Sequence, residues 1–260
     1  MPMAALSVTL DRNDPFPRIG DALPPLWHWL YFPDLCLHSD LADDGHPKRG
    51  GIIPPVPLSQ RMYAGGRLLF IRDLRVGDSV TRTTRISDVR HREGRTGPLV
   101  FVVLHHEISN EDGVALIEEQ DIVYREPAKS NGSVKIAKKA PAVAEWTQMT
   151  RPSDVLLFRY SALTFNGHRI HYDRRFAAEV EGFPGLVVHG PLIATLLLEL
   201  LRDHVPGARV ASFVFRALKP LFDIEPFLVA GRFSDDRSTV ELWAADGTGD
   251  LATEATATLA

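Results

Sequence analysis

Residues 191–207 constrain the fold more than any other part of this chain. Leucine and isoleucine recur at helical spacing across 192–201, and Leu198 extends the apolar surface almost all round the expected helix. Pro191 fits the first helical position, and Pro206-Gly207 ends the run. The run is too short to cross a bilayer. The sequence therefore predicts a buried helix, and an antiparallel sheet wrapped round it would cover both.

Strand patterns occur twice in the chain, in the same order. Segments 68–71, 80–86, 99–109 and 115–124 match segments 213–216, 227–233, 238–244 and 252–260 in their apolar patterning. Turn-forming residues at 110–113 and 246–250 separate the last two segments of each set. We therefore predict an internal duplication, with antiparallel strands in each copy. In the first copy, residues 26–32 (Leu-Trp-His-Trp-Leu-Tyr-Phe) are the candidate for a shorter, aromatic helix.

A lysine-rich stretch with flanking prolines divides the two copies. Residues 127–144 are rich in lysine and small residues, a composition typical of a linker or a long surface connection. The predicted organisation is a first repeat over residues 1–126, a linker over 127–144 and a second repeat over 145–260.

The composition is that of an ordinary globular protein, with 45% hydrophobic and 24% charged residues and a net charge of −4. That charge does not favour nucleic acid or an anionic membrane as a partner. Residues 1–6 lack the basic start and apolar core of a signal peptide. The single cysteine, Cys36, excludes an internal disulfide and fits a reducing compartment. We expect a cytoplasmic protein with no nucleic-acid or membrane partner.

Two short segments carry most of the distinctive chemistry. Residues 165–173 read Phe-Asn-Gly-His-Arg-Ile-His-Tyr-Asp, and residues 187–191 read Val-Val-His-Gly-Pro. Neutral His171 is a candidate general base, and the amide of Asn166 can orient a water molecule. Gly190 begins the apolar helix, where a free N–H can stabilise a developing oxyanion. These groups suit chemistry next to a carbonyl.

The same residues allow plainer interpretations. Asn166 and Asp173 are also typical helix-capping residues. His168 and His171 could form a metal-binding pair, but no third ligand is suggested, and we expect no metal. In the first repeat, Arg61, Tyr63 and Arg67 flank Gly65-Gly66, a backbone that can pass close to a ligand. Either arginine could bind a carboxylate or phosphate, or could be an ordinary surface residue.

The segment from Asn166 to His171, followed by Val188-His189-Gly190, resembles the hydratase 2 motif of the MaoC-like (R)-specific enoyl-CoA hydratases. That motif has an aspartate, four residues, a histidine and a later His-Gly at the start of the central hot-dog helix. The resemblance implies that His171 is the catalytic histidine and that the N–H of Gly190 holds the thioester oxygen. Asn166 replaces the aspartate of the family. A scheme in which the acid and the base are separate titrating groups is therefore in doubt, and His171 would act alone or together with Asp173 or Tyr172.

Residues 163–173 and 60–67 are similar to a subgroup. It comprises mitochondrial 3-hydroxyacyl-thioester dehydratases and bacterial mesaconyl-CoA, 3-methylfumaryl-CoA and itaconyl-CoA hydratases. The resemblance, from about Leu23 to the C-terminus, implies an α+β double hot-dog fold. In that fold two antiparallel sheets each wrap a central helix, and a catalytic second repeat is fused to a non-catalytic, substrate-binding first repeat. The expected substrate-binding residues are Arg61, Tyr63, Gly65, Gly66, Arg67, Tyr172 and Asp173.

The implied reaction is reversible hydration of an enoyl-CoA, and we expect a short dicarboxylyl-CoA such as itaconyl-CoA or mesaconyl-CoA as the substrate. The alternatives are a 3-hydroxyacyl-ACP or -CoA dehydratase of fatty acid synthesis, a hot-dog acyl-CoA thioesterase and a non-catalytic thioester-binding module. No cofactor is expected, since coenzyme A is part of the substrate. A double hot-dog chain could also form a homodimer.

Overall fold

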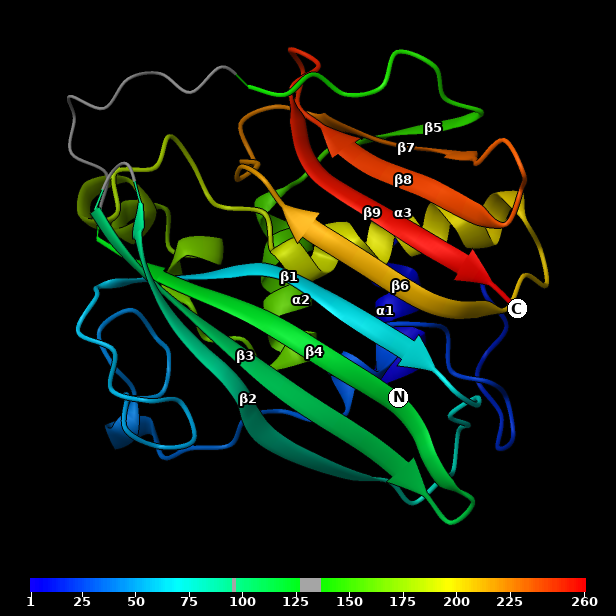
Figure 1. The fold of residues 1–260 in the computed structure, drawn as a ribbon, viewed down its shortest axis with the longest axis horizontal. Coiled ribbons are helices and arrows are strands. Elements are labelled where there is room, and N and C mark those ends of the chain that lie inside the picture. Colours follow the sequence, from blue (N-terminus) through cyan, green and yellow to red (C-terminus); the bar gives the residue numbers. More distant parts are fainter. Residues whose placement is uncertain (95–96, 127–136) are drawn as a thin grey trace.

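One curved antiparallel sheet dominates the molecule (Figure 1). In the computed structural model, which describes residues 1–94, 97–126 and 137–260, the sheet has nine strands. The strands are β1 (Gln60–Phe70), β2 (Thr81–Gly94), β3 (Gly97–Asn110), β4 (Gly113–Arg125), β5 (Trp146–Thr150), β6 (Val210–Ala217), β7 (Phe227–Phe233), β8 (Thr239–Ala245) and β9 (Leu251–Leu259). The helices are α1 (Pro2–Thr9), α2 (Asp154–Thr164) and α3 (Gly190–His204). Short helical turns are η1 (Trp27–Leu30), η2 (His38–Asp40), η3 (Arg169–His171) and η4 (Phe176–Val180).

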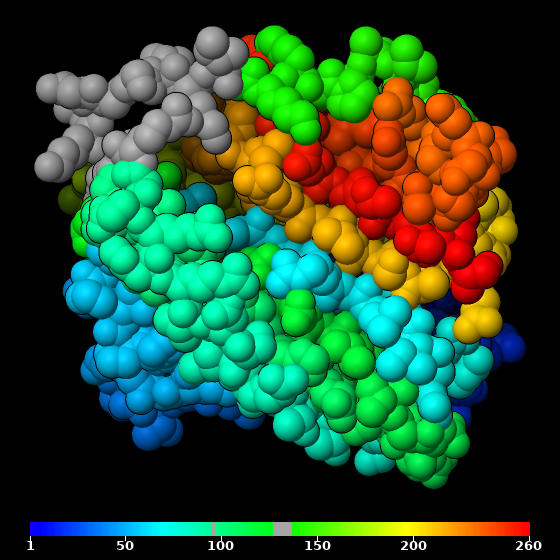
Figure 2. All heavy atoms as spheres, viewed as in Figure 1, coloured from blue at the N-terminus to red at the C-terminus, as the bar shows by residue number. Residues whose placement is uncertain are grey.

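The strand order agrees with the predicted duplication. It runs β2-β3-β4-β1-β6-β9-β8-β7-β5, so each half contributes the same four-strand pattern and the halves meet at β1 and β6. These two strands pair antiparallel, with Arg67 opposite Val214. The two sheets expected from the sequence are thus one continuous sheet. Figure 2 shows the halves adjoining as one surface on the face viewed there.

The predicted linker is only partly described. Residues 127–136 of the 127–144 stretch lie outside the described residues. After them, Lys138 pairs with Glu254 and Lys139 with Asp250, which fixes the beginning of this segment on the second half. The segment then leads into β5, which pairs with β7 at the end of the sheet.

The second half buries the predicted helix. All ten residues from Leu192 to Leu201 are buried, as the apolar pattern requires. The helix lies against the concave side of the sheet formed by the C-terminal strands (Figure 1). Each fully buried leucine contributes about 1.5–3 kcal/mol of transfer free energy, so this helix anchors the core. In the described part of the chain, no helix is both long and apolar enough to span a bilayer.

The described residues of the first half form no comparable helix. The aromatic segment 26–32 forms only the single 3₁₀ turn η1, so the expected shorter helix is reduced to one turn. Pro24 and Pro25 precede it and Pro33 follows it, and proline disfavours helix in the residue before it. Leu26 also has a left-handed backbone, with φ of 70°. The concave face of β2, β3 and β4 is therefore covered by loops, which leave a cavity beneath them.

Candidate active site

The candidate site is a cavity of about 1680 Å³ that both halves line. The first half contributes the loop after Phe32 and the inner faces of β1 to β4, and the second half contributes the end of α2, η3 and the start of α3. Among the residues predicted from the sequence, six line this cavity: Arg61, Tyr63, Asn166, His171, Tyr172 and Gly190. The other four, Gly65, Gly66, Arg67 and Asp173, do not line it.

His171 is held as a neutral imidazole in η3. Its side chain is buried, and its Nδ1 lies 2.7 Å from the carbonyl oxygen of Val187. A carbonyl only accepts, so Nδ1 carries the hydrogen and Nε2 keeps its lone pair. Burial lowers the pKa of His171 to about 4, despite the opposing effect of the Val187 hydrogen bond. The side chain is therefore in the form that a general base requires at neutral pH.

Asn166 lies just after α2, where the helix ends at left-handed Phe165. Its Oδ1 accepts a hydrogen bond from the backbone N–H of His168 at 3.0 Å, which forms a turn leading into η3. Its amide NH₂ has no partner among the described residues, and the residue lines the cavity. The amide is thus available to donate a hydrogen bond to a water molecule.

Gly190 is the first residue of α3, directly after His189. The first intrahelical bond runs from Ile193 N–H to the His189 carbonyl, and the Gly190 N–H has no acceptor in the described residues. A β-carbon at Gly190 would meet only the Cβ of Tyr63, at 4.0 Å, so the backbone is open to the cavity. The N–H has the helix dipole behind it and can stabilise an anionic oxygen.

His189 connects these two groups. Its buried ring stacks on His171 with 3.7 Å between ring centroids, and its Nε2 is 2.8 Å from the hydroxyl of Ser161 on α2. Burial lowers the pKa of His189 well below its usual value, and the neighbouring rings of His171 and His168 lower it further. This neutral ring fixes the distance between the base candidate and the start of α3.

A register shift in β1 decides which first-half residues reach the cavity. Tyr63 pairs with Ile122 and Gly65 with Asp121, so Ala64 is an extra residue in the strand. Arg61 and Tyr63 therefore face inward, whereas Arg67 faces outward. There Arg67 forms ion pairs with Glu119 at 2.7 Å and with Asp121.

The two glycines of this strand serve its packing on β6. A β-carbon on Gly65 would lie 2.3 Å from the Phe215 carbonyl oxygen, and one on Gly66 would lie 2.9 Å from the Phe215 ring. The close approach predicted for this backbone is therefore made to the neighbouring strand, and neither glycine lines the cavity.

Tyr172 and Asp173 lie at the edge of the site. Tyr172 lines the cavity, and its hydroxyl donates to the carbonyl of Gly167 at 2.9 Å. Asp173 accepts from Arg169 at 2.7 Å and from the N–H of Phe176 at 3.0 Å. Asp173 thus has the capping role that the sequence left open, at the start of the turn containing η4.

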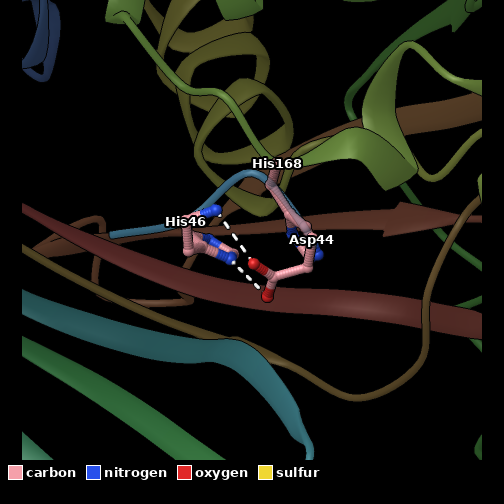
Figure 3. A group of neighbouring side chains, drawn as sticks. All are labelled: Asp44, His46 and His168. Atoms are coloured by element: carbon pink, nitrogen blue, oxygen red, sulfur yellow. Dashed lines mark hydrogen bonds and ion pairs between the residues drawn. The ribbon is translucent and has the colours of Figure 1, made fainter. Parts of the chain in front are cut away.

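Three cavity residues group together that the sequence did not connect: Asp44, His46 and His168 (Figure 3). One donor atom from each lies within 4.8 Å of the others. The rings of His46 and His168 are 4.1 Å apart between centroids, and His168 contacts His171 edge-on at 5.4 Å. The suggested pair His168 and His171 is thus not the group with metal-ligand spacing, since His168 groups instead with the two first-half residues.

A buried carboxylate, Glu118 on β4, lies deeper in the cavity. Its oxygens accept from Trp29 Nε1 at 3.0 Å and lie 2.9 Å from His28 Nε2 and 3.5 Å from the Tyr63 hydroxyl. This network fixes η1 and Tyr63 against the sheet. No sequence pattern pointed to Glu118, Asp44 or His46, because only the folded chain brings their separate segments to one cavity.

The arrangement can deprotonate water next to a polarised carbonyl. It combines a neutral imidazole with an amide and a helix N-terminal N–H, both without a partner in the described chain, around one cavity. The first half adds Arg61, for which no ion pair exists among the described residues.

Comparisons with known proteins agree with this chemistry. The sequence profile of the family hydroxyacyl-thioester dehydratase type 2 matches residues 26–223, which include both halves of the site. The chain is 45% identical to mesaconyl-C(4)-CoA hydratase of Chloroflexus aurantiacus over 94% of this chain and 86% of that protein. It is 25% identical to the mitochondrial hydroxyacyl-thioester dehydratase type 2 of Schizosaccharomyces pombe, over 93% and 91% of the two chains.

Solved structures show the same fold. HtdX of Mycobacterium tuberculosis superposes with a TM-score of 0.69 at 19% identity, covering 99% of this chain and 94% of that one. A MaoC-like dehydratase from Phytophthora capsici gives a TM-score of 0.66 at 14% identity, covering 100% and 92%. The predicted α+β hot-dog architecture is confirmed by these likenesses, with the difference that, in the described chain, only the second half has a central helix.

Proposed function

Because this chain belongs to the hydroxyacyl-thioester dehydratase type 2 family, and is a hydro-lyase, we propose that its substrate is a short dicarboxylyl-CoA. The enzyme would add water to the double bond of an enoyl-CoA such as mesaconyl-CoA or itaconyl-CoA and would remove it in the reverse direction. The relative at 45% identity is a hydratase of mesaconyl-C(4)-CoA, and mesaconyl-C(4)-CoA is such a short dicarboxylyl-CoA.

The proposed reaction uses three groups of the second half. Nε2 of His171 takes a proton from water as the oxygen attacks C3 of the enoyl thioester, and the amide of Asn166 orients that water. The π electrons move to the thioester oxygen, where the Gly190 N–H stabilises the enolate. C2 then receives a proton. Stacked His189 keeps the base close to the N-terminus of α3 throughout.

The environment of Arg61 is the observation that supports a dicarboxylyl-CoA as the substrate. Arg61 lines the cavity and, among the described residues, has no acidic partner, whereas Arg67 on the same strand is saturated by two carboxylates. A cavity-facing guanidinium would be costly without an anion to bind. The distal carboxylate of a dicarboxylyl-CoA would supply that anion.

A panel of thioesters tests the proposal, using mesaconyl-C4-CoA, itaconyl-CoA, crotonyl-CoA and a medium-chain enoyl-CoA. Loss of the enoyl-thioester absorbance reports hydration, and a thiol reagent reports free CoA. We expect kcat/KM to be highest for a dicarboxylyl-CoA. Equal turnover of crotonyl-CoA would contradict the substrate class, and a medium-chain preference would favour a dehydratase of fatty acid synthesis. Release of CoA without loss of the chromophore would indicate a thioesterase.

Arg61→Ala and Arg67→Ala form a matched pair on one strand. Arg61→Ala should lower kcat/KM for the dicarboxylyl-CoA by roughly 10- to 100-fold, mainly through KM, because a hydrogen bond to a charged group contributes about 1.5–3 kcal/mol. It should change crotonyl-CoA hydration little. Arg67→Ala should leave both substrates unaffected, because that side chain lies on the outer face.

A further inference from the structure

The first half brings a second histidine to the reaction cavity. His46 and Asp44 lie on the loop between η2 and β1, where Figure 3 shows them beside His168. Both line the cavity that His171 and Gly190 also line. The loop is fixed on the motif of the second half, since the backbone N–H of Arg169 donates to the Asp44 carbonyl at 2.9 Å. The Arg169 guanidinium also donates to the Asp43 carbonyl at 2.9 Å.

Asp44 holds His46 in one orientation. One carboxylate oxygen accepts from the backbone N–H of His46 at 2.9 Å, and the other lies 3.1 Å from its Nδ1. A carboxylate paired with Nδ1 favours the tautomer with its hydrogen on that atom. Burial lowers the pKa of His46, so the resting ring is neutral, and the Asp44 hydrogen bond opposes this lowering and stabilises the imidazolium that forms when the ring takes up a proton. Nε2 of His46 has no hydrogen-bond partner in the described residues and keeps its lone pair for another group.

His46 therefore matches His171 in its bonding. In each ring an acceptor engages Nδ1, Asp44 in one case and the Val187 carbonyl in the other, and Nε2 is free of protein partners in the described chain. The two rings belong to opposite halves and are separated by His168, which contacts both. Asn166, at the position where the hydratase motif has an aspartate, cannot exchange a proton. The other imidazole of this motif, His168, is the poorer proton carrier, because burial lowers its pKa to about 2.

We propose that the Asp44–His46 pair is the second acid/base group of the site and that His46 exchanges the proton at C2 of the acyl chain. This inference rests on the proposed hydration reaction. It makes the active site composite, with the first repeat supplying part of the chemistry as well as substrate contacts.

The proton balance follows directly. In hydration, neutral His171 takes a proton from water as the C3–O bond forms, and the enolate charge moves to the thioester oxygen at Gly190. The imidazolium of His46 then gives its proton to C2, and the enolate pair becomes the new C–H bond. His171 ends protonated and His46 neutral, and exchange with solvent restores both. Dehydration runs these steps in reverse, with neutral His46 removing the C2 proton.

A divalent cation bound by Asp44, His46 and His168 would be a different use of this cluster. One observation favours the acid/base pair. One Asp44 oxygen accepts from the backbone N–H of His46 and the other lies 3.1 Å from its Nδ1, so both carboxylate oxygens are already engaged by His46.

Isotope exchange at C2 separates the roles of the two histidines. The probe is succinyl-CoA in D₂O, which has no double bond to hydrate, and NMR follows deuterium entering the carbon next to the thioester. We expect wild-type enzyme to catalyse exchange, His46→Gln to lose it and His171→Gln to retain it. Asp44→Asn should give an intermediate rate. In hydration of the enoyl-CoA that the panel identifies, His46→Gln should lower kcat by roughly 10²- to 10⁴-fold with little change in KM.

Controls separate this role from a structural one. His91→Gln, on the exposed side of β2, should behave as wild type. If glutamine disturbs the fold, His46→Ala with added free imidazole replaces it, and imidazole should restore exchange. Because the variants are compared on whichever enoyl-CoA is turned over, failure of the dicarboxylyl preference leaves this test intact.

Four results would overturn the proposal. The first is a His46→Gln variant whose kcat equals that of the wild type. The second is C2 exchange that persists in His46→Gln and disappears in His171→Gln. The third is a wild-type enzyme that hydrates its substrate and catalyses no exchange. The fourth is a stoichiometric divalent metal in the purified protein that His168→Ala removes.

Discussion

The two halves of this molecule share a strand order but use their concave faces differently. In the second half, α3 fills that face with ten consecutive buried residues. In the first half, a single 3₁₀ turn and a long loop replace the helix, and the space beneath them is the cavity. One half of this fold can thus hold the packed core, while the other half lacks the central helix and has space for a ligand instead.

The polar residues follow the same division. In the second half, buried His168, His171 and His189 lie beside the packed helix. In the first half, Glu118 occupies the inner face of the sheet, where the second half has apolar side chains. Both groups face one cavity, so stability and chemistry can be perturbed separately in each half.

The largest effect should come from His171→Gln. Loss of the general base should lower kcat roughly 10²- to 10⁴-fold, while loss of the Nδ1 donor to the Val187 carbonyl should lower the free energy of unfolding by about 1–3 kcal/mol. Steady-state hydration kinetics and a thermal melt measure the two effects. His204→Gln, near the exposed end of α3, is the matched control. A kcat within a few-fold of wild type would remove the chemistry from the second half.

Leucine truncations should separate core from loop. Leu197→Ala, in the fully buried middle of α3, should lower the free energy of unfolding by about 2–5 kcal/mol. Leu37→Ala, in the exposed loop of the first half, should change it by about 0.5 kcal/mol or less. Urea unfolding measures both. Similar losses for the two variants would contradict the division between a packed half and an open half.

A pair of glycines tests the contact between the halves. Gly45 and Gly50 both have left-handed φ, +88° and +107°, so alanine should cost roughly 1–2 kcal/mol at either position. At Gly45 the new methyl would also lie 1.9 Å from the Gly167 carbonyl oxygen, whereas at Gly50 it meets nothing within 4 Å.

Gly45→Ala should therefore displace Asp44 and His46 from the cavity. A shift of about 1 Å near reacting groups can cost on the order of 100-fold in rate, so we expect kcat to fall on the order of 10-fold or more. Gly50→Ala should lose stability without this loss of kcat. Equal kcat values for the two variants would show that the loop position does not matter to the reaction.

The smallest effect should be a difference in acid sensitivity. Burial lowers the pKa of His168 to about 2 and that of His171 to about 4. The unfolded chain binds protons on these groups near pH 6.5, so stability should fall as the pH drops from about 6.5 to 4. His168→Gln should flatten this slope in urea unfolding measured at several pH values. An unchanged slope would exclude His168 as its source.

Glu118 should act in a lower window. Burial alone would raise the pKa of Glu118. The hydrogen bond to His28 and the attraction between the two groups, the largest of several opposing interactions, outweigh burial, so the pKa is lowered. A depressed carboxyl pKa stabilises the fold above the unfolded value of about 4.3 and loses that effect as the pH falls below it. Glu118→Gln should therefore alter stability at neutral pH and leave the slope between pH 6.5 and 5 unchanged.

Periodicity predicted the sheet, the buried helix and the duplication because these follow from local patterns. The positions of His171, Asn166 and Gly190 around one cavity agree with their motif spacing along one continuous segment. The contribution of Asp44 and His46 was not predictable, because their loop is held by hydrogen bonds from Arg169 to the carbonyls of Asp43 and Asp44, which join residues more than 120 positions apart. Arg67 was predicted to bind substrate but lies on the outer face, because the sequence pattern of a strand does not reveal the extra residue Ala64.

That extra residue, Ala64, has a consequence for the acyl pocket. A strand shifted by one position exchanges its inward and outward side chains. The two arginines, Arg61 and Arg67, are six positions apart and would share one face of a regular strand, so the bulge between them is what sets them on opposite faces. Deletion of Ala64 would leave them five positions apart and still on opposite faces. A bulge moved outside the segment between them would place both on one face, so the position of a single extra residue sets the charge of the acyl pocket.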